Sequence, residues 1–181
     1  MNPTASSTTT RRRMAQGIAL TLGGLASPKT LAAMAQKPLA ELAASEANKS
    51  RTSLHQSIQL NASPERIYAA LLDAKQFASF SGLPAQIDPK AGGLFSMFGG
   101  QIVGMTVELV PNQRIVQAWR PAHWNPGVYS MARFELKPGN PVGTTVVLDH
   151  TGFPEGDFDS LDWGWHSHYW EPLRKFLATK G

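Results

Sequence analysis

Residues 159–177, DSLDWGWHSHYWEPLRKFL, have the pattern of a helix that is apolar around more than half of its circumference. On a helical wheel the apolar side chains sweep about 200°. They are Leu161, Trp163, Trp165, Tyr169, Trp170, Leu173, Phe176 and Leu177. The remaining arc carries Ser160, Ser167, Glu171, Arg174 and Lys175. This apolar arc is too wide for a surface helix, so the pattern predicts a helix packed against a sheet.

Two residues interrupt this helix. Gly164 lowers the helix propensity by roughly 1 kcal/mol and allows another backbone to approach closely. Pro172 removes the hydrogen bond to residue 168 and predicts a bend. Both positions are therefore expected to disturb a regular helix.

A strand and a helical region come first in the domain. Residues 55–61 alternate in the manner of a strand. Residues 63–65, Ser-Pro-Glu, then supply an N-cap oxygen, a proline at the first helical position and an acid at the positive end of the helix dipole. The helical region ends at residues 82–84, Gly-Leu-Pro. Its predicted apolar face comprises Ile67, Ala70, Leu71 and Phe77.

Several strands separated by turn residues follow, at residues 94–98, 101–110, 114–120, 128–136 and 144–150. On the long strand after Gly99-Gly100, the alternation predicts one face with Val103, Met105, Val107 and Leu109 and an opposite face with Thr106 and Glu108. This order of elements excludes a parallel βαβ sheet. We therefore predict an α+β domain over residues 52–181. A curved antiparallel sheet of six to seven strands wraps a long C-terminal helix, with short helices after the first strand.

Six short motifs occur in order along this region. They are Ala62-Ser63-Pro64-Glu65-Arg66-Ile67-Tyr68, Gly92-Gly93-Leu94-Phe95, Gly104 with Glu108-Leu109-Val110-Pro111, Ile115-Val116 with Trp119-Arg120, His150-x-Gly152-Phe153-Pro154, and Gly164-Trp165 with Tyr169-x-Glu171-Pro172-Leu173. Together they resemble the bacterial branch related to activators of the heat-shock-protein-90 ATPase, in the START-like (SRPBCC) helix-grip superfamily. The resemblance implies a helix-grip fold with a hydrophobic cavity between sheet and helix. It implies no single activity, because the superfamily includes lipid carriers, hormone receptors, aromatase/cyclase enzymes and co-chaperone domains.

An apolar pocket between the sheet and the C-terminal helix is the predicted binding site. Its predicted ligand-binding residues are Phe95, Met105, Trp119, Trp124, Ser130, His150, Trp165 and Tyr169. The aromatic side chains could line a pocket for a flat or lipid-like ligand, and the alternative is that they form plain core. Small inward residues, Ser130 and Ala132, favour a void, because a sheet that only packs a helix usually carries larger groups there.

His150 is the most informative polar residue of this set. It shares a strand face with Val146 and Leu148, and that face is expected to point at the helix. An inward imidazole at the mouth of an apolar cavity could bind a ligand carbonyl or act as an acid or base. The alternative is a structural histidine that is satisfied by a loop carbonyl and holds the turn at residues 151–154. Apolar surroundings favour the structural role.

The sequence predicts no metal, no cofactor and no catalytic residue. His166 and His168 are two apart on a helix, so their side chains diverge by about 200°, and no HExxH motif, carboxylate cluster or thiolate supports them. The chain has no cysteine. P-loop, GxGxxG and GxSxG motifs are absent, which gives no support to nucleotide binding or serine hydrolysis.

The formal charge of +4 does not indicate binding to nucleic acid, because it is unevenly distributed. Residues 1–51 carry seven basic and two acidic residues, which leaves +5. Residues 52–181 carry ten basic and eleven acidic residues, which leaves −1. The domain therefore lacks a basic surface for phosphates, and nucleic acid is not a predicted partner.

Residues 1–35 have the order of regions found in an export signal. Three arginines at residues 11–13 precede a weakly apolar run over residues 15–26, and residues 33–35, Ala-Met-Ala, form a small-x-small cleavage site. The segment resembles a twin-arginine signal, and the alternative is a basic tail. Use of the signal predicts a periplasmic or secreted protein, and otherwise a cytoplasmic one. The run is too short and interrupted for a stable membrane anchor, and residues 36–51 are interpreted as a linker.

The predicted function is binding of a small hydrophobic or amphipathic molecule without chemistry, since no acid–base pair converges on the pocket. One alternative is an enzyme of the cyclase or hydrolase type that uses His150. The other is a co-chaperone-like interaction module, whose chaperone partner is implied by the resemblance alone.

Overall fold

The structure is a computed structural model that describes residues 41, 43–139 and 143–179 of the 181-residue chain. The predicted export signal over residues 1–35 lies outside these described residues. The described part of the predicted linker includes a helix at residues 43–49. No helix in the described part of the chain has the length and apolarity needed to cross a membrane.

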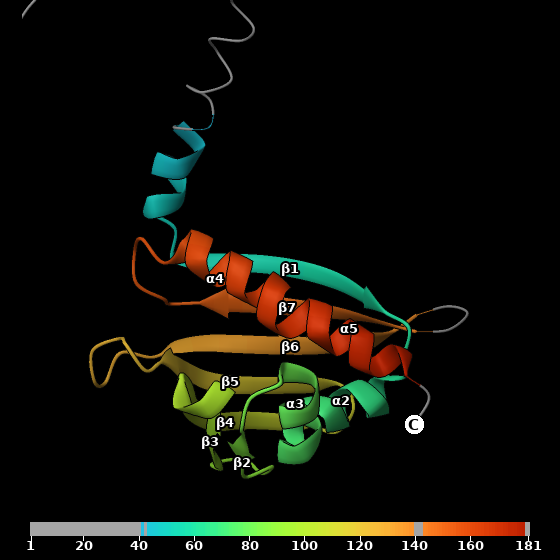
Figure 1. Ribbon diagram of the computed structural model, residues 1–181. Coiled ribbons are helices and arrows are strands. Elements are labelled where there is room, and N and C mark those ends of the chain that lie inside the picture. The colour runs from blue at the N-terminus through green and yellow to red at the C-terminus, as the bar shows by residue number, and fades with distance from the viewer. Residues whose placement is uncertain (1–40, 42, 140–142, 180–181) are drawn as a thin grey trace, which may run out of the picture. The chain divides into compact units, whose positions relative to one another are not determined.

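Seven antiparallel strands form one sheet in the order β1-β7-β6-β5-β4-β3-β2 (Figure 1). The strands are β1 (Ser53–Leu60), β2 (Gln86–Ile87), β3 (Leu94–Met97), β4 (Ile102–Val110), β5 (Arg114–Pro121), β6 (Ser130–Pro138) and β7 (Thr144–Thr151). The first strand pairs with the last along its whole length, from Ser53 opposite Thr151 to Leu60 opposite Thr144. The predicted antiparallel sheet is confirmed.

Two short helices follow β1, as predicted. They are α2 (Pro64–Leu72) and α3 (Ala74–Ser81), and a 3₁₀ turn, η1 (Phe98–Gly100), precedes β4. Ser63 caps α2, since its Oγ accepts a hydrogen bond from the Arg66 N–H at 3.4 Å. Asp73 ends α2 and caps α3 by accepting from the Gln76 N–H at 2.8 Å. Its extended backbone divides the helical region into two helices.

A long helical segment lies across one face of the sheet, and α2 and α3 cover another part of that face (Figure 1). The segment consists of α4 (Phe158–Gly164), the π-helical η2 (Trp165–Trp170) and α5 (Glu171–Ala178). The core fills the space between the layers, and its largest fully buried side chains include Trp165, Trp170, Phe77, Ile115, Leu148 and Leu173. Burial of this apolar surface is the main force that holds helix and sheet together. The predicted α+β helix-grip architecture is confirmed.

Val103, Met105 and Val107 share one face of β4 as predicted, but that face is the outer one, and the assignment of Leu109 to it was wrong. Gly104 and Thr106 point into the core, whereas Met105 and Val107 are exposed at 39% and 44%. Residue 104 is a glycine because this inward position has no room for a side chain. A Cβ on Gly104 would stand only 2.4 Å from the ring of Phe95. The apolar alternation of this strand therefore faces away from the helices.

A β-bulge explains why the alternation misled. The register with β5 shifts between Thr106 and Glu108, so one extra residue occupies β4. The extra residue returns Leu109 to the inner face, opposite the buried Ile115. Met105, which was predicted to bind ligand, precedes the bulge and lies on the outer face of the sheet.

The C-terminal segment also departs from an ideal helical wheel. The π-helical turn of η2 is wider than an α-helical turn, and Leu161 before it and Leu173 and Leu177 after it are all buried in the core. Trp163 was expected to point inward and is instead 61% exposed. Pro172 lies in the first turn of α5, where a missing N–H is tolerated. The irregularity expected from the proline thus takes the form of a π-helix directly before it.

The last residues of the predicted linker contact the start of α4. The Asn48 side chain donates to Asp159 Oδ1 at 2.8 Å, and the Gly156 N–H donates to the Lys49 carbonyl at 2.7 Å. The Arg51 guanidinium lies 3.6 Å from the ring centroid of Phe158. This cation–π contact and the two hydrogen bonds join residues 48–51 to the C-terminal helical segment.

Candidate ligand-binding cleft

A cleft of about 440 Å³ opens between the α4–η2 segment and the ends of β4 and β5. Its buried floor consists of Phe98, Trp119, Leu161, Trp165 and Tyr169. Its exposed rim includes Leu83, Gln101, His123, Ser160, Trp163 and His168. This volume lies within the range of about 300–1,000 Å³ that is usual for small-molecule sites.

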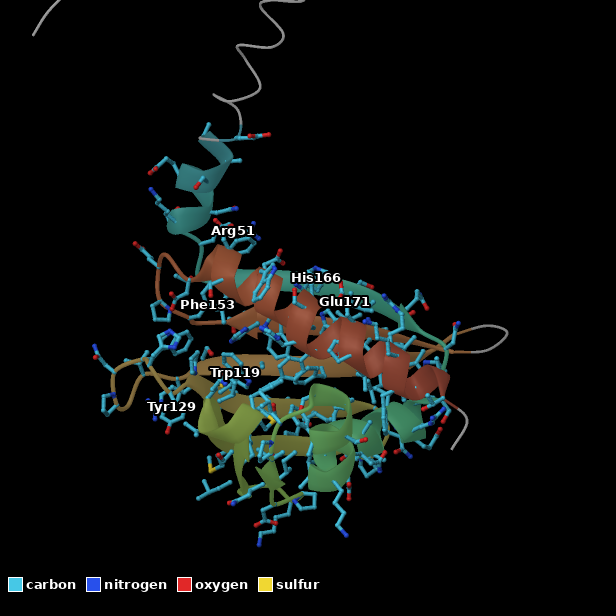
Figure 2. All side chains as sticks on the ribbon, viewed as in Figure 1. Arg51, Trp119, Tyr129, Phe153, His166 and Glu171 are labelled. Atoms are coloured by element: carbon cyan, nitrogen blue, oxygen red, sulfur yellow. The ribbon has the colours of Figure 1, made fainter. Side chains whose placement is uncertain are left out.

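Stacked aromatic rings form the floor. Trp119 projects from β5 into the space between the sheet and the helical segment (Figure 2). Its ring lies 5.5 Å from that of Trp165 at an interplanar angle of 30°, and the Trp165 ring is 4.3 Å from that of Tyr169. The two helical residues reach the same floor because η2 places residues four apart on one side. The floor therefore offers flat apolar surface, which suits an apolar ligand.

The polar atoms of the floor are turned into the protein. The indole nitrogen of Trp119 is buried and has no hydrogen-bond partner within the described residues. The Tyr169 hydroxyl donates to Met97 Sδ at 4.0 Å, a weak acceptor. Burial raises the pKa of Tyr169, so the hydroxyl stays neutral at ordinary pH. These groups give the floor little polarity that a ligand could reach.

The rim is polar and contains one exposed indole. Trp163 stands edge-on to the imidazole of His168, with ring centroids 4.9 Å apart and an interplanar angle of 89°. His123 follows β5 and lies on a loop that Arg120 holds, because Nη1 of Arg120 donates to the Trp124 carbonyl at 2.9 Å. The rim can therefore form hydrogen bonds with a ligand whose apolar part reaches the floor.

Gly164 belongs to the wall of the cleft and leaves room in it. Its backbone is helical, with φ −61° and ψ −42°, and nothing lies within 4 Å of the place where a Cβ would stand. The close backbone approach expected at Gly164 was therefore wrong. A side chain at this position would extend into the cleft.

Three of the eight predicted ligand-binding residues line the cleft: Trp119, Trp165 and Tyr169. Trp124 packs behind the floor, with its ring 6.3 Å from that of Trp119. Phe95 is buried over Gly104, outside the cleft. The remaining predicted residues are Met105, on the opposite face of the sheet, and Ser130 and His150, which lie beneath the floor.

His150 forms a buried chain of hydrogen bonds behind Trp165. The Trp165 indole N–H donates to His150 Nδ1 at 3.0 Å, so the proton of the neutral imidazole resides on Nε2. Nε2 donates to Ser130 Oγ at 2.7 Å, and the Ser130 hydroxyl donates to the Trp119 carbonyl at 2.9 Å. Burial lowers the pKa of His150 to about 3. Both ring nitrogens are thus occupied, by side chains and not by the loop carbonyl considered from the sequence.

Sequence reasoning missed Phe98, His123 and His168 as cleft residues, whereas Trp163 was among the aromatic residues considered as pocket lining. Phe98 sits in a turn with φ +53°, and His123 lies on a loop, so neither belongs to a periodic pattern. His168 lies within the wide turn of η2. A glycine and a proline in one apolar helix were the available signal that the helix is irregular.

Comparison with known proteins identifies relatives of this chain. Residues 61–178 match the model of the family described as "Activator of Hsp90 ATPase homolog 1-like protein". The "Activator of 90 kDa heat shock protein ATPase homolog 2" of Mus musculus is 29% identical over 124 residues, which is 68% of this chain and 37% of that protein. The homologous activator of Dictyostelium discoideum is 29% identical over 107 residues, 59% of this chain and 28% of that protein. The chain thus spans about a third of the length of these curated relatives.

A solved structure with a similar fold is that of an HSP90 activator from Plasmodium falciparum. It is 27% identical in sequence, with a TM-score of 0.67, and the match covers 70% of this chain and 96% of that one. The helix-grip architecture is therefore shared with an experimentally determined structure.

Proposed function

The chain belongs to the family of activator of Hsp90 ATPase homolog 1-like proteins, and from that premise and the cleft we propose that it binds a small hydrophobic or amphipathic molecule. The observation that carries this proposal is an aromatic floor of stacked rings beneath an open space of about 440 Å³. A domain that only had to pack a helix on a sheet would fill this space with side chains. The polar rim supports an amphipathic ligand.

Gly164 provides a direct test of the proposal. Gly164→Leu would place a branched side chain in the cleft, whereas Gly164→Ala adds one methyl group where nothing lies within 4 Å. Both changes raise helix propensity, so any loss of ligand binding reports on the cleft. A thermal-shift screen of lipids and aromatic compounds is run on the wild type and on both variants.

We expect a ligand that stabilises the wild type and Gly164→Ala but not Gly164→Leu. At a hundredfold excess over the Kd, the stabilisation is about 2.7 kcal/mol. Absence of any stabilising compound would refute the proposal. A ligand that stabilises Gly164→Leu as strongly as the wild type would also refute it, because that ligand would bind elsewhere.

A second candidate function is interaction with an Hsp90-type chaperone. The names of the relatives support it, as does a row of exposed apolar side chains on the outer face of the sheet. The register of the strands aligns Leu94, Met105, Ala118 and Met131 directly across β3 to β6. Exposed apolar surface of this kind often marks a site of contact with another protein.

The chaperone candidate is tested with an Hsp90-type ATPase from the same organism. We expect the chain to raise its ATP hydrolysis, Met105→Glu to reduce the effect, and Ser57→Glu to leave it unchanged. Ser57 is an exposed residue of β1 and lies outside the apolar row. An ATPase rate that the chain does not change would exclude this function.

The alternative of an enzyme that uses His150 gains no support from the geometry. His150 is fully buried, both of its ring nitrogens are hydrogen-bonded, and it does not line the cleft. A proton-transfer residue must come within hydrogen-bonding reach of the substrate.

A further inference from the structure

The polar side chains at the rim of the cleft determine which charge it can carry. The polar groups that line it are the imidazoles of His123 and His168, the amide of Gln101 and the hydroxyl of Ser160. No Asp, Glu, Lys or Arg is among the described residues that line the cleft. The charge that the lining itself can carry is therefore positive and comes from two histidines, without a carboxylate to neutralise it.

A permanent positive charge lies next to one of these histidines. Nη1 of Arg120 donates to the carbonyls of Ala122 and Trp124, at 3.5 and 2.9 Å, and these residues flank His123 on both sides. The guanidinium remains charged at all ordinary pH values. The potential at this part of the rim therefore favours a negatively charged group on a ligand.

Trp163 adds a flat surface to the same rim. The side chain is 61% exposed, although folding favours the burial of an indole. Its edge-on contact with His168 holds two rings at the entrance of the cleft. An exposed indole above a floor of stacked rings is suited to contact a planar ring that enters between them.

We infer that the cleft takes a planar aromatic anion, with its ring between Trp163 and the aromatic floor and its negative group at the rim that carries His123 and His168. This inference rests on the proposed function of ligand binding and specifies the chemical class of the ligand. The aromatic part loses contact with water on the apolar floor, while the anionic group remains at the solvated rim. A carboxylate there receives charge-assisted hydrogen bonds from the imidazoles.

The test compares two probes of nearly equal shape, 2-naphthoate and 2-naphthamide, by calorimetric titration of the full chain. The titrations are made at about pH 6. The variants are the double change His123→Gln with His168→Gln, and His166→Gln as the control. All three histidines are exposed, so the variants are expected to fold, and His166 does not line the cleft (Figure 2).

We expect the wild type and His166→Gln to bind naphthoate about fivefold more tightly than naphthamide, as exposed charge pairs allow. In the double variant the preference for naphthoate should fall, because only the Arg120 charge remains near the rim, and Gly164→Leu should bind neither probe. Equal affinities in the wild type would overturn the anionic class while leaving the proposed function intact. A full preference for naphthoate that survives in the double variant would overturn the role given to His123 and His168. If neither probe binds the wild type, this inference is refuted as well. The broader screen with Gly164→Leu then decides separately on ligand binding.

Discussion

His150 joins four elements of the fold through its two ring nitrogens. It lies on β7, receives the Trp165 indole N–H from η2, and reaches β5 through Ser130 of β6. Each donor and acceptor in this chain is buried and has one partner that suits it. Removal of the imidazole would leave Trp165 and Ser130 unsatisfied in an apolar environment, where an unpaired polar group is costly.

His150→Ala should therefore lower the free energy of unfolding by about 2–4 kcal/mol, from two unsatisfied groups and a cavity. Ligand affinity should change little, because His150 does not line the cleft. His166→Ala, at an exposed position, should cost under about 0.5 kcal/mol. Urea denaturation measures both variants, and equal stabilities would show that the hydrogen-bond chain is unimportant.

The same histidine predicts how stability depends on pH. Burial lowers the pKa of His150 to about 3 in the folded state, while in the unfolded state it keeps its ordinary value of about 6.5. Between these values the unfolded chain binds a proton that the folded chain excludes, so stability falls as the pH falls. The loss approaches about 1.4 kcal/mol per pH unit.

His150→Gln lacks this titration. From about pH 6 to pH 4, the wild type should lose about 2 kcal/mol more than the variant in free energy of unfolding. Urea midpoints at several pH values provide the measurement, and the carboxylates common to both proteins cancel in the difference. Parallel pH profiles would contradict the prediction.

The π-helical turn η2 determines which side chains of the C-terminal segment reach the sheet. Trp165, Tyr169 and Trp170 are all buried, although an α-helix would distribute them less favourably. Gln56 of β1 fixes the end of the turn, since its Oε1 accepts a hydrogen bond from the Trp170 indole at 2.5 Å. The wide turn thus serves both the core and the cleft, as π-helical turns at functional sites often do.

Trp165→Ala should be the costliest single change in the C-terminal segment, with a loss of about 3–5 kcal/mol. The indole is buried, stacks on Trp119 and donates to His150. Arg174→Ala should cost under about 0.5 kcal/mol, because Arg174 is exposed. Guanidinium denaturation of both variants is the measurement. If Trp165→Ala had little effect on stability and Arg174→Ala had a large one, the buried and exposed faces of this segment would have been assigned the wrong way round.

Pro172→Ala should lower stability modestly, by about 0.5–1 kcal/mol. The proline lies in the first turn of α5, where it fits without strain and reduces the freedom of the unfolded chain. Chemical denaturation measures the change. A more stable alanine variant would mean that the proline strains the helix and that η2 is a consequence of that strain.

Strands and helices in which apolar and polar residues repeat regularly could be predicted from the sequence. Those that contain a bulge or another local irregularity could not. The alternation in β1 and β7 and the cap at Ser63 predicted their structures correctly. The bulge in β4 inserts one residue, so Leu109 does not share the face of Met105 to which it was assigned. Trp163, in α4 before the π-helical turn, was assigned to the apolar arc and is exposed. The rim of the cleft depends on this turn and on loops, which carry no period.

The two ends of the domain hold the molecule together. β1 pairs with β7, and Arg66 of α2 donates to the carbonyls of Leu177 and Thr179, at 2.8 and 2.6 Å, at the end of α5. The C-terminal segment therefore contacts the sheet, α2 and α3 at once. A fold in which one segment closes the core should lose its stability as a unit when that segment is absent.

Deletion of residues 158–181 should unfold the domain and not merely empty the cleft. The deletion exposes the inner face of the sheet, including Phe134, Leu148 and Ile115. We expect no cooperative transition in thermal denaturation and no dispersed amide signals in an NMR spectrum. A truncated chain with a sharp melting transition would contradict this expectation.

The pairing of β1 with β7 also affects how the chain can fold while it is being synthesised. During synthesis, β1 leaves the ribosome long before its only neighbour in the sheet has been made, and the helical segment that covers the core comes later still. Contacts between such distant parts of a chain slow folding, because a long loop must close before they form. The nascent chain must therefore keep the apolar residues of β1, β5 and β6 from associating with other molecules until the C-terminal helical segment has been made.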